Sequence, residues 1–225
     1  MGVEREKEME KLERIQRRIL ERIAKLELQL SSSSSDDAAN DATAVRLSGI
    51  LRSNGVNDFK FKVVPSDYYE RSLEARRDLL SAPSIHHLCK SIVLVNTQAR
   101  SDVIDCSNRY NSKYYVVVVQ YTARFNAETV KNYLYTLNQG KVPKKKFNLR
   151  LAPEEISNNL TGFEHNAVTC IGMKTDIPVI LDEAIVKLSP DFFWLGGGEI
   201  YLKMGIRTSE FIQFVKPFIF SCSAA

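Results

Sequence analysis

Hydrophobic and polar positions alternate along the chain with two different periods. Every second residue is apolar in residues 59–64 and again in residues 199–206, which is typical of strands with one buried face. Residues 90–95 and 114–121 are apolar on both faces, so we expect them to be central strands of a sheet. Residues 177–181 form a further apolar run of strand length. The pattern therefore predicts five strands.

Other segments carry apolar residues three and four positions apart, which is the period of a helix. They predict helices over residues 44–51, 69–80, 126–137, 152–160 and 209–215. Asn126 is a suitable N-cap for the third of these helices, and Gly140 lies beyond its end. Because strands and helices are interspersed on an unequal schedule, the predicted fold class is α+β, with a mixed sheet flanked by helices.

The first 41 residues differ from the rest. Residues 3–30 predict one charged amphipathic, coiled-coil-like helix, whose seam is formed by Met9, Leu12, Ile19, Ile23, Leu26 and Leu30. Residues 31–41 are rich in Ser and Asp and predict a flexible linker. We therefore divide the chain into a helix over residues 1–30, a linker over 31–41 and a domain over 42–225. Whether the helix packs on its own domain, on a second copy or on a partner stays open.

Charge separates the same regions. Up to residue 45 there are 8 basic and 10 acidic residues, whereas from residue 46 onward there are 23 and 17, so the domain has a net charge of +6. Its one dense cluster of basic residues consists of Lys141, Lys144, Lys145 and Lys146. A modest positive field suits a phosphate-bearing ligand, but many surfaces that bind nothing are equally basic.

Several classes of protein are excluded by what the sequence lacks. No apolar run approaches the roughly 20 residues of a membrane helix, and the glutamate-rich start resembles neither a secretory nor an organellar signal. We therefore expect a cytoplasmic protein without membrane contact. The four cysteines are far apart and only three histidines are present, so we expect reduced thiols and no metal site. No cofactor motif is present.

Three features of the domain are candidates for chemistry. Lys90 opens an apolar strand, where a lysine is costly unless its ammonium reaches water or faces a pocket. Residues 162–172 predict an exposed loop between a helix and a strand. The glycines Gly196, Gly197 and Gly198 permit a tight turn and close backbone approach. Each feature alone has a structural explanation as good as the functional one.

Taken together and in order, three blocks resemble the YbaK/EbsC family of aminoacyl-tRNA deacylases, also called the synthetase-associated editing domain. The segment Cys89–Leu94 is similar to the family's lysine-bearing strand. Thr161-Gly162-Phe163 and the loop from Asn166 to Gly172 are similar to its glycine-rich loop. Residues 177–182, the glycine turn and residues 199–206 resemble its C-terminal half. The resemblance covers roughly residues 45–220 and identifies the chain as a divergent member.

The resemblance implies a partly barrel-like mixed sheet with a pocket for the 3′ end of a mischarged tRNA. It implies hydrolysis of the ester between a wrong amino acid and tRNA, often tRNA for proline, in trans to the synthetase and without a cofactor. Lys90 corresponds to the family lysine, whose ammonium would stabilise developing negative charge. The substrate-binding residues would then be Asn166, Ala167, Val168, Thr169, Cys170, Gly196, Gly197, Gly198 and Lys203. The lysine cluster at residues 141–146 would contact tRNA phosphates.

The departures from the family pattern leave a second hypothesis open. Asn166 and Cys170 stand where the family loop has glycine and proline, and Lys203 stands where an acidic residue is frequent. A second cation near Lys90 either strengthens phosphate binding or disables ester positioning. The alternative is therefore a catalytically silent adaptor that binds tRNA, or a synthetase through residues 3–30. Cys170 is a further candidate nucleophile, with His165 as the nearest histidine in the sequence.

Overall fold

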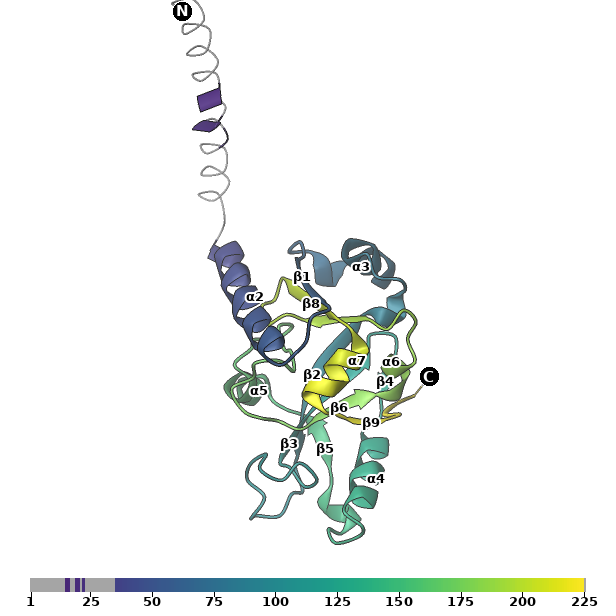
Figure 1. Ribbon diagram of the computed structural model, residues 1–225. Helices are drawn as coiled ribbons and strands as arrows, with labels where there is room; N and C mark the ends of the chain where they lie inside the picture. The colour runs from purple at the N-terminus through teal and green to yellow at the C-terminus, as the bar shows by residue number, and fades with distance from the viewer. Residues whose placement is uncertain (1–14, 17–18, 21, 23–34, 225) are drawn as a thin grey trace, which may run out of the picture. The chain divides into compact units, whose positions relative to one another are not determined.

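Figure 1 shows the computed structural model of the chain, which describes residues 15–16, 19–20, 22 and 35–224. The chain divides into two compact units, Met1–Asp41 and Ala42–Ala225. The described residues of the first unit are helical, and Ile15, Ile19 and Leu20 among them are exposed. The predicted helix over residues 3–30 and its docking to a synthetase lie mostly outside the described residues.

Helix α2 (Ser35–Ser53) includes residues for which the sequence predicts a linker. Its second half carries the buried residues Leu47 and Leu51, which fix several helical turns by packing. Once a helix is nucleated, each further residue adds one hydrogen bond at little cost, and acidic residues near the N-terminus interact favourably with the helix dipole. The prediction of a flexible segment over residues 35–41 rests on their composition alone. Composition does not show that a helix fixed by the packing of Leu47 and Leu51 can extend toward its N-terminus.

The larger sheet contains five strands in the order β5 (Leu149–Leu151), β2 (Cys89–Asn96), β3 (Tyr114–Gln120), β6 (Val179–Asp182) and β9 (Phe218–Phe220). Strand β2 pairs antiparallel with β3 and β5, whereas β3 with β6 and β6 with β9 are parallel. The sheet is therefore mixed, as predicted. Its central strands β2 and β3 are those that the sequence marks as apolar on both faces.

The smaller sheet has the order β1 (Phe59–Val63), β8 (Leu202–Ile206) and β7 (Phe193–Gly196), with all pairs antiparallel. Strands β7 and β8 form a hairpin whose turn contains Gly197 and Gly198, so β8 starts later than the predicted residue 199. Two further short strands, β4 (Arg124–Phe125) and β10 (Ser223–Ala224), pair with each other.

Helices cover the sheets at several places (Figure 1). They are α3 (Leu73–Leu80), α4 (Ala127–Leu137), α5 (Glu154–Thr161), α6 (Glu183–Val186) and α7 (Thr208–Val215), with the short 3-10 helices η1 (Tyr68–Glu70), η2 (Ile85–His87) and η3 (Lys144–Lys146). The predicted helix over residues 69–80 is divided into η1 and α3, because Ser72 is extended and caps α3. The predicted cap of α4 is confirmed: the side chain of Asn126 accepts hydrogen bonds from two backbone N–H groups.

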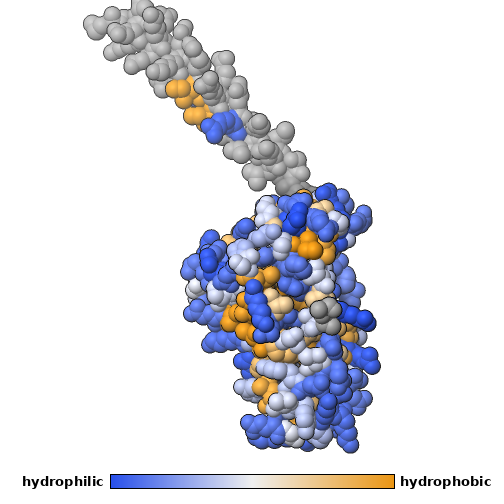
Figure 2. Space-filling view, turned by 90° about the vertical axis from the view of Figure 1, so that its right-hand side faces the viewer, coloured by the Kyte–Doolittle hydropathy of each residue, from blue (hydrophilic) through white to orange (hydrophobic). Residues whose placement is uncertain are grey.

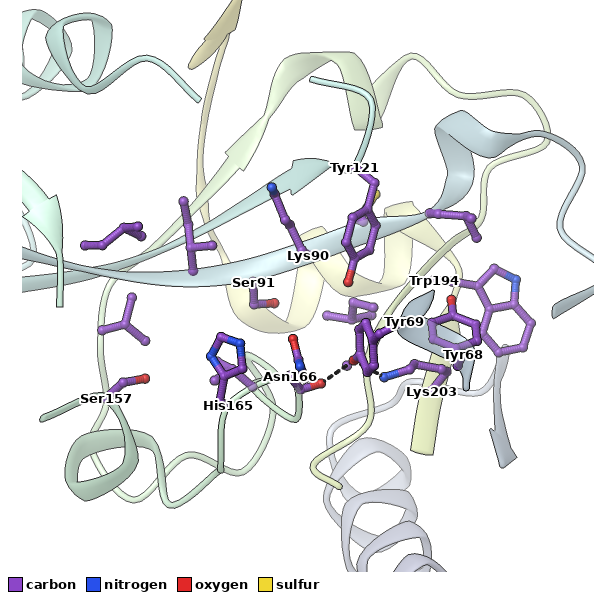
Figure 3. A pocket seen from close by; sticks show the side chains of 18 of the residues that line it. Tyr68, Tyr69, Lys90, Ser91, Tyr121, Ser157, His165, Asn166, Trp194 and Lys203 are labelled. Carbon is purple, nitrogen blue, oxygen red and sulfur yellow. Dashed lines mark hydrogen bonds between the residues drawn. The ribbon is translucent and has the colours of Figure 1, made fainter. Parts of the chain in front are cut away.

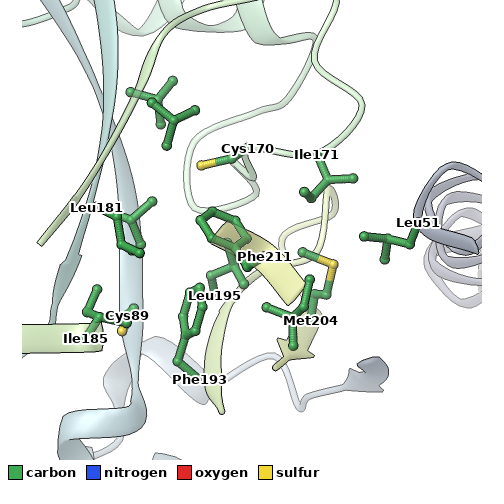
Figure 4. Packing of buried hydrophobic residues seen from close by; sticks show 14 of the residues in the cluster. Leu51, Cys89, Cys170, Ile171, Leu181, Ile185, Phe193, Leu195, Met204 and Phe211 are labelled. Carbon is green, nitrogen blue, oxygen red and sulfur yellow. The ribbon is translucent and has the colours of Figure 1, made fainter. Parts of the chain in front are cut away.

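The main hydrophobic core lies between the two sheets (Figure 4). The larger sheet contributes Val116, Val118 and Leu181, and the smaller sheet contributes Leu195 and Met204. On its other face, β3 packs Tyr115, Val117 and Val119 into a second cluster with α4. Because β3 is buried on both faces, the position of β2 beside it is held firmly, and β2 carries Lys90.

The predicted fold class is confirmed: the domain is α+β, with a mixed sheet flanked by helices. The sheets do not close into a barrel, in contrast to the partly barrel-like sheet that the family resemblance implies. An isolated bridge between Leu88 and Trp194 links the start of β2 to β7. The candidate site is a cavity beside β2, and both residues of this bridge line it.

Candidate functional site

A cavity of about 570 Å³ lies beside β2 (Figure 3). Its size is within the range of ligand-binding pockets, about 300–1,000 Å³. Its wall is built from β2, η1, the loop after α5 and the β7–β8 hairpin. The side chains that give it polar or aromatic character are Tyr68, Tyr69, Lys90, Ser91, Tyr121, Glu154, Ser157, His165, Asn166, Trp194 and Lys203.

Lys90 is one of the residues that line this cavity, and we call the part of the cavity beside it the Lys90 end. It is the second residue of β2 and pairs with Val119 of β3. Its side chain is half-buried, and its Nζ lies 5.7 Å from the centre of the Tyr121 ring. No salt bridge to Lys90 is present among the described residues. Lys90 therefore lines the cavity without a carboxylate partner among the described residues.

Lys203 lies at the other end, which we call the Lys203 end. It is only 4% exposed, although it is a lysine on a strand. Its ammonium donates hydrogen bonds to Tyr69 Oη and to the Ile200 carbonyl oxygen, and it lies 4.5 Å and 5.2 Å from the ring centres of Tyr69 and Tyr68. Gly196 is its partner on β7.

The surroundings of Lys203 change its ionisation. Burial, together with the positive charge of Arg76, lowers the pKa of Lys203 from 10.5 to about 7. Burial also raises the pKa values of Tyr68 and Tyr69 well above 10, so both rings stay protonated at neutral pH. The hydroxyl of Tyr69 donates to the carbonyl oxygen of Asn166 at 2.6 Å, which joins Lys203 to the loop after α5.

The loop after α5 is held against the glycine turn by backbone contacts. Asn166 has a φ of 67°, a left-handed conformation that asparagine tolerates better than most residues. A Cβ on Gly196 would lie 2.4 Å from the Val168 carbonyl oxygen, and the Gly198 N–H donates to the Ala167 carbonyl oxygen at 3.0 Å. Only glycine at position 196 allows this approach, which fixes one wall of the cavity.

The structure brings some of the predicted site residues together and leaves others out. Lys90, Asn166, Val168, Gly196 and Lys203 line the cavity. The remaining predicted residues, Ala167, Thr169, Cys170, Gly197 and Gly198, do not line it and instead support the loop and the turn from behind. The segment over residues 162–172 is therefore not the exposed loop that the sequence predicts, because about half of its side chains are buried.

Cys170 is packed in the main core and its Sγ lies 3.8 Å from Ser91 Oγ. Burial raises the pKa of its thiol to about 12. A thiol is nucleophilic as the thiolate, which is scarce at neutral pH when the pKa is this high. Ser91, and not His165, is the polar group in contact with this sulfur, so the geometry does not support Cys170 as a nucleophile.

Sequence reasoning missed the aromatic part of the site. Tyr68, Tyr69 and Trp194 line the Lys203 end, and Arg76 lies over the rings of Tyr68, Tyr69 and Tyr121 at 5.4–5.6 Å. These residues come from segments far apart in the chain, and none stands in a motif. The pair Tyr68-Tyr69 directly before a helix is the only signal that the sequence offers.

A second, more polar groove of about 550 Å³ lies at the N-terminus of α4. Arg124, Lys131 and Arg150 line it, together with Glu128. Glu128 forms salt bridges with Lys131 and Lys144, so the predicted lysine cluster is continuous with this groove. Strand β5 borders both hollows, since Leu151 lines the first cavity and Arg150 lines the groove.

Two further findings concern the described residues. None of their helices is long and apolar enough to cross a membrane. Within the same residues, no group of three or more His, Cys, Asp or Glu side chains could hold a metal ion. Figure 2 shows one face of the molecule, on which hydrophobic residues interrupt a mainly hydrophilic surface.

Comparison with known proteins shows which family the chain belongs to. The model of a family described as "Aminoacyl-tRNA editing domain" matches residues 80–214, which is more than half of the chain. These residues include β2 with Lys90, the loop after α5 and the β7–β8 hairpin. The search of curated proteins gave no match.

Solved structures share the fold at low sequence identity. One is the crystal structure of "a putative trans-editing enzyme for prolyl tRNA synthetase", with a TM-score of 0.62, 19% identity and coverage of 81% of this chain and 98% of that chain. Another comes from work on epitope backbone grafting onto scaffold proteins, with a TM-score of 0.61, 16% identity and coverage of 81% and 97%. A third, a hypothetical protein, has a TM-score of 0.58, 16% identity and coverage of 79% and 99%.

Proposed function

Because this chain belongs to the aminoacyl-tRNA editing domain family, we propose that it is a trans-acting deacylase that hydrolyses the ester bond of mischarged tRNA. The observation that carries the proposal is the cavity of about 570 Å³ with Lys90 among the residues that line it. Such a cavity is large enough to take the terminal nucleoside of a tRNA with its aminoacyl group.

Lys90 has the chemistry that ester hydrolysis needs. Attack on the ester carbonyl places negative charge on its oxygen, and a fixed ammonium in a partly water-excluded site stabilises that charge. Lys90 is half-buried and has no carboxylate in a salt bridge with it among the described residues, so its charge is not already used. The nucleophile is then water or a group of the substrate itself, since Cys170 is protonated and buried.

The wall of the cavity determines which aminoacyl groups fit. Asn166, Val168 and Gly196 form the side that is held by backbone contacts, and that side has little freedom to adapt. Discrimination by size alone is modest, about 1–3 kcal/mol for each methylene group. The hydrophobic and aromatic lining suits a small aminoacyl group with the terminal base stacked on a ring.

The groove at α4 extends the proposed site toward the rest of the tRNA. Its cations and the cluster Lys141, Lys144, Lys145 and Lys146 suit phosphate groups, and β5 borders both the groove and the cavity. A ligand with a reactive end and a phosphate backbone would occupy both hollows. Because neutralised phosphates release counterions, the affinity for tRNA should fall steeply with salt.

The alternative hypothesis is a silent adaptor that keeps the fold and binds tRNA without hydrolysis. It predicts a cavity that is filled near Lys90 by Lys203 or Cys170. Lys203 instead lies in the wall with its ammonium on Tyr69, and Cys170 is buried behind Ser91. The open cavity therefore favours the deacylase over the adaptor.

The proposal is tested by deacylation of a panel of mischarged tRNAs, including proline tRNA that carries alanine, cysteine or serine. We expect the wild type to release at least one of these amino acids, and Lys90→Ala to reduce that rate at least 100-fold. The affinity for tRNA should change less than 3-fold in this variant, because Lys90 interacts mainly with the reacting ester.

A matched control is Lys187→Ala, which removes an exposed lysine at the C-cap of α6 that forms a salt bridge with Glu183. An exposed pair of this kind contributes little, so both rate and affinity should stay at the wild-type level. The deacylase is contradicted if no ester of the panel is cleaved while tRNA still binds, a result that the adaptor predicts. An unchanged rate in Lys90→Ala would contradict the role of Lys90.

A further inference from the structure

The charges around the cavity are unbalanced. Lys90 and Lys203 line it, and the guanidinium of Arg76 lies over the neighbouring rings of Tyr68 and Tyr69. The one carboxylate among the described lining residues belongs to Glu154, which is exposed at the start of α5. The interior therefore carries positive charge that no described acidic side chain in the lining neutralises.

Lys203 is the most deeply buried of these cations, at 4% exposure. A protonated lysine has three N–H donors, and two of them bind Tyr69 Oη and the Ile200 carbonyl oxygen. The described residues supply no third partner and no carboxylate within salt-bridge distance. One donor of the ammonium is therefore available to a ligand, since Lys203 lines the cavity.

Burial of an ammonium without a counter-charge is unfavourable, and the faces of Tyr68 and Tyr69 offset only part of the cost. The part of this cost that the rings do not offset is one reason why the pKa of Lys203 is lowered to about 7. A ligand anion beside Nζ would supply the missing charge and would raise this pKa again. A bound anion would therefore stabilise the charged form of Lys203 at this end of the cavity.

We propose that the Lys203 end of the cavity is an anion-binding subsite, in which the ammonium of Lys203 binds a carboxylate or phosphate group of the ligand. The identity of the ligand rests on the proposed function. Two parts of an aminoacyl-tRNA carry such a group: the side chain of an acidic aminoacyl group, and the phosphate next to the terminal adenosine. By the same reasoning, this end of the cavity repels the protonated α-amino group of a substrate.

The groups that face Lys203 are few. Tyr68 and Tyr69 come from η1, Arg76 from α3 and the exposed Lys62 from β1, while β7 contributes Gly196. Both tyrosines have raised pKa values and stay neutral at neutral pH. Lys203 is therefore the group whose charge changes near neutral pH at this end, and binding of an anion should weaken as the pH rises above 7.

A direct binding experiment tests the subsite without any need for activity. The full chain is labelled on lysine side chains, the Lys203 signal is assigned by its loss in Lys203→Met, and its titration is followed by NMR. The probes are two pairs that differ in one anionic group: AMP against adenosine, and N-acetylaspartate against N-acetylasparagine, both with the α-carboxyl blocked as the amide. We expect at least one charged probe to raise the pKa of Lys203 by half a unit or more, and its neutral analogue to leave it unchanged.

Two variants accompany this titration. In Lys203→Met the affinity for the effective charged probe should fall at least 5-fold, whereas in the control Lys62→Met it should fall less than 2-fold. Lys203→Arg is the second variant if Lys203→Met does not fold, because it keeps the charge but displaces it. The subsite is overturned if charged and neutral probes bind the wild type equally, or if the 5-fold loss does not occur.

The source of the anion is decided by the same probes together with activity. An effect of AMP alone assigns the subsite to the terminal phosphate. An effect of N-acetylaspartate alone assigns it to an acidic aminoacyl group, and esters of aspartate should then be hydrolysed at least 10-fold faster than esters of asparagine. If no ester is hydrolysed but a charged probe binds at Lys203, the deacylase fails and the anion subsite stands.

Discussion

The two ends of the cavity carry the same side chain in different surroundings. Lys90 is half-buried on β2, with one aromatic ring 5.7 Å from its Nζ. Lys203 is almost fully buried on β8, with two rings and two hydrogen-bond acceptors around its ammonium. At the Lys203 end, burial and the nearby Arg76 lower the pKa to about 7.

This difference shows that the role of a charged residue depends on what covers it. The two lysines stand on strands of different sheets, and both line the cavity. Lys90 is only half-buried and lines the cavity, so it can interact with a reacting group. Lys203 is enclosed by η1 and the hairpin turn. Its charge can therefore interact only with a ligand group that reaches this inner wall of the cavity.

The largest expected effect is on the pH dependence of stability at the Lys203 end. The pKa of Lys203 is about 7 in the folded chain and 10.5 in the unfolded chain, so the unfolded state binds more protons between these values. Stability then rises with pH in this window. The free energy of unfolding of the wild type, minus that of Lys203→Met, should increase by about 1.4 kcal/mol per pH unit from pH 7 to 9. Urea denaturation at each pH measures it.

The control for this prediction is Lys62→Met, which removes a positive charge from an exposed position opposite Lys203. It reports the general effect of net charge, and that effect is small for an exposed residue. A difference between wild type and Lys203→Met that stays flat over pH 7–9 would show that burial does not control the charge of Lys203.

The second prediction concerns Gly196, the partner of Lys203 across the hairpin. A Cβ at this position would lie 2.4 Å from the Val168 carbonyl oxygen, so Gly196→Ala forces the loop away from β7. Overpacking of this kind costs about 1–3 kcal/mol. We expect that loss of stability in thermal or urea unfolding, together with a loss of deacylation of at least 10-fold.

The matched control is Gly49→Ala in α2, where the added methyl group meets no atom within 4 Å. Alanine is favoured over glycine inside a helix by about 1 kcal/mol, so this variant should be stabilised and keep its activity. If the two substitutions change stability equally, the close approach of Gly196 to the loop is not a constraint.

Much of the fold was predictable because it depends on local pattern. Strands β1, β2, β3 and β6 follow from periodicity and from apolar runs, and the cap of α4 follows from the single residue Asn126. The start of β8 was placed too early, because alternation continues through the hairpin turn. Part of the strand pairing was not predictable, since it joins segments far apart in the chain, such as β1 with β8 and β4 with β10.

The site was predictable only in part, for the same reason. Lys90 and the loop could be identified because a lysine at an apolar strand and a glycine-rich segment are visible in one dimension. Tyr69 could not, because its role is the link between Lys203 and Asn166, two residues that are distant in sequence. Thr169 and Cys170 were placed in the site by the motif, but the structure turns both toward the interior.

The smallest expected effect concerns Cys170, next to the Lys90 end. Its thiol has a pKa of about 12, so the fraction of thiolate at pH 7.5 is on the order of 10⁻⁴ to 10⁻⁵. Cys170→Ala should therefore change the rate of deacylation less than 2-fold, in contrast to the large loss in Lys90→Ala. Iodoacetamide should label the half-buried Cys106 before Cys170, because Cys106 is more accessible. A 100-fold loss in Cys170→Ala with an intact fold would make the thiol, and not water, the nucleophile beside Lys90.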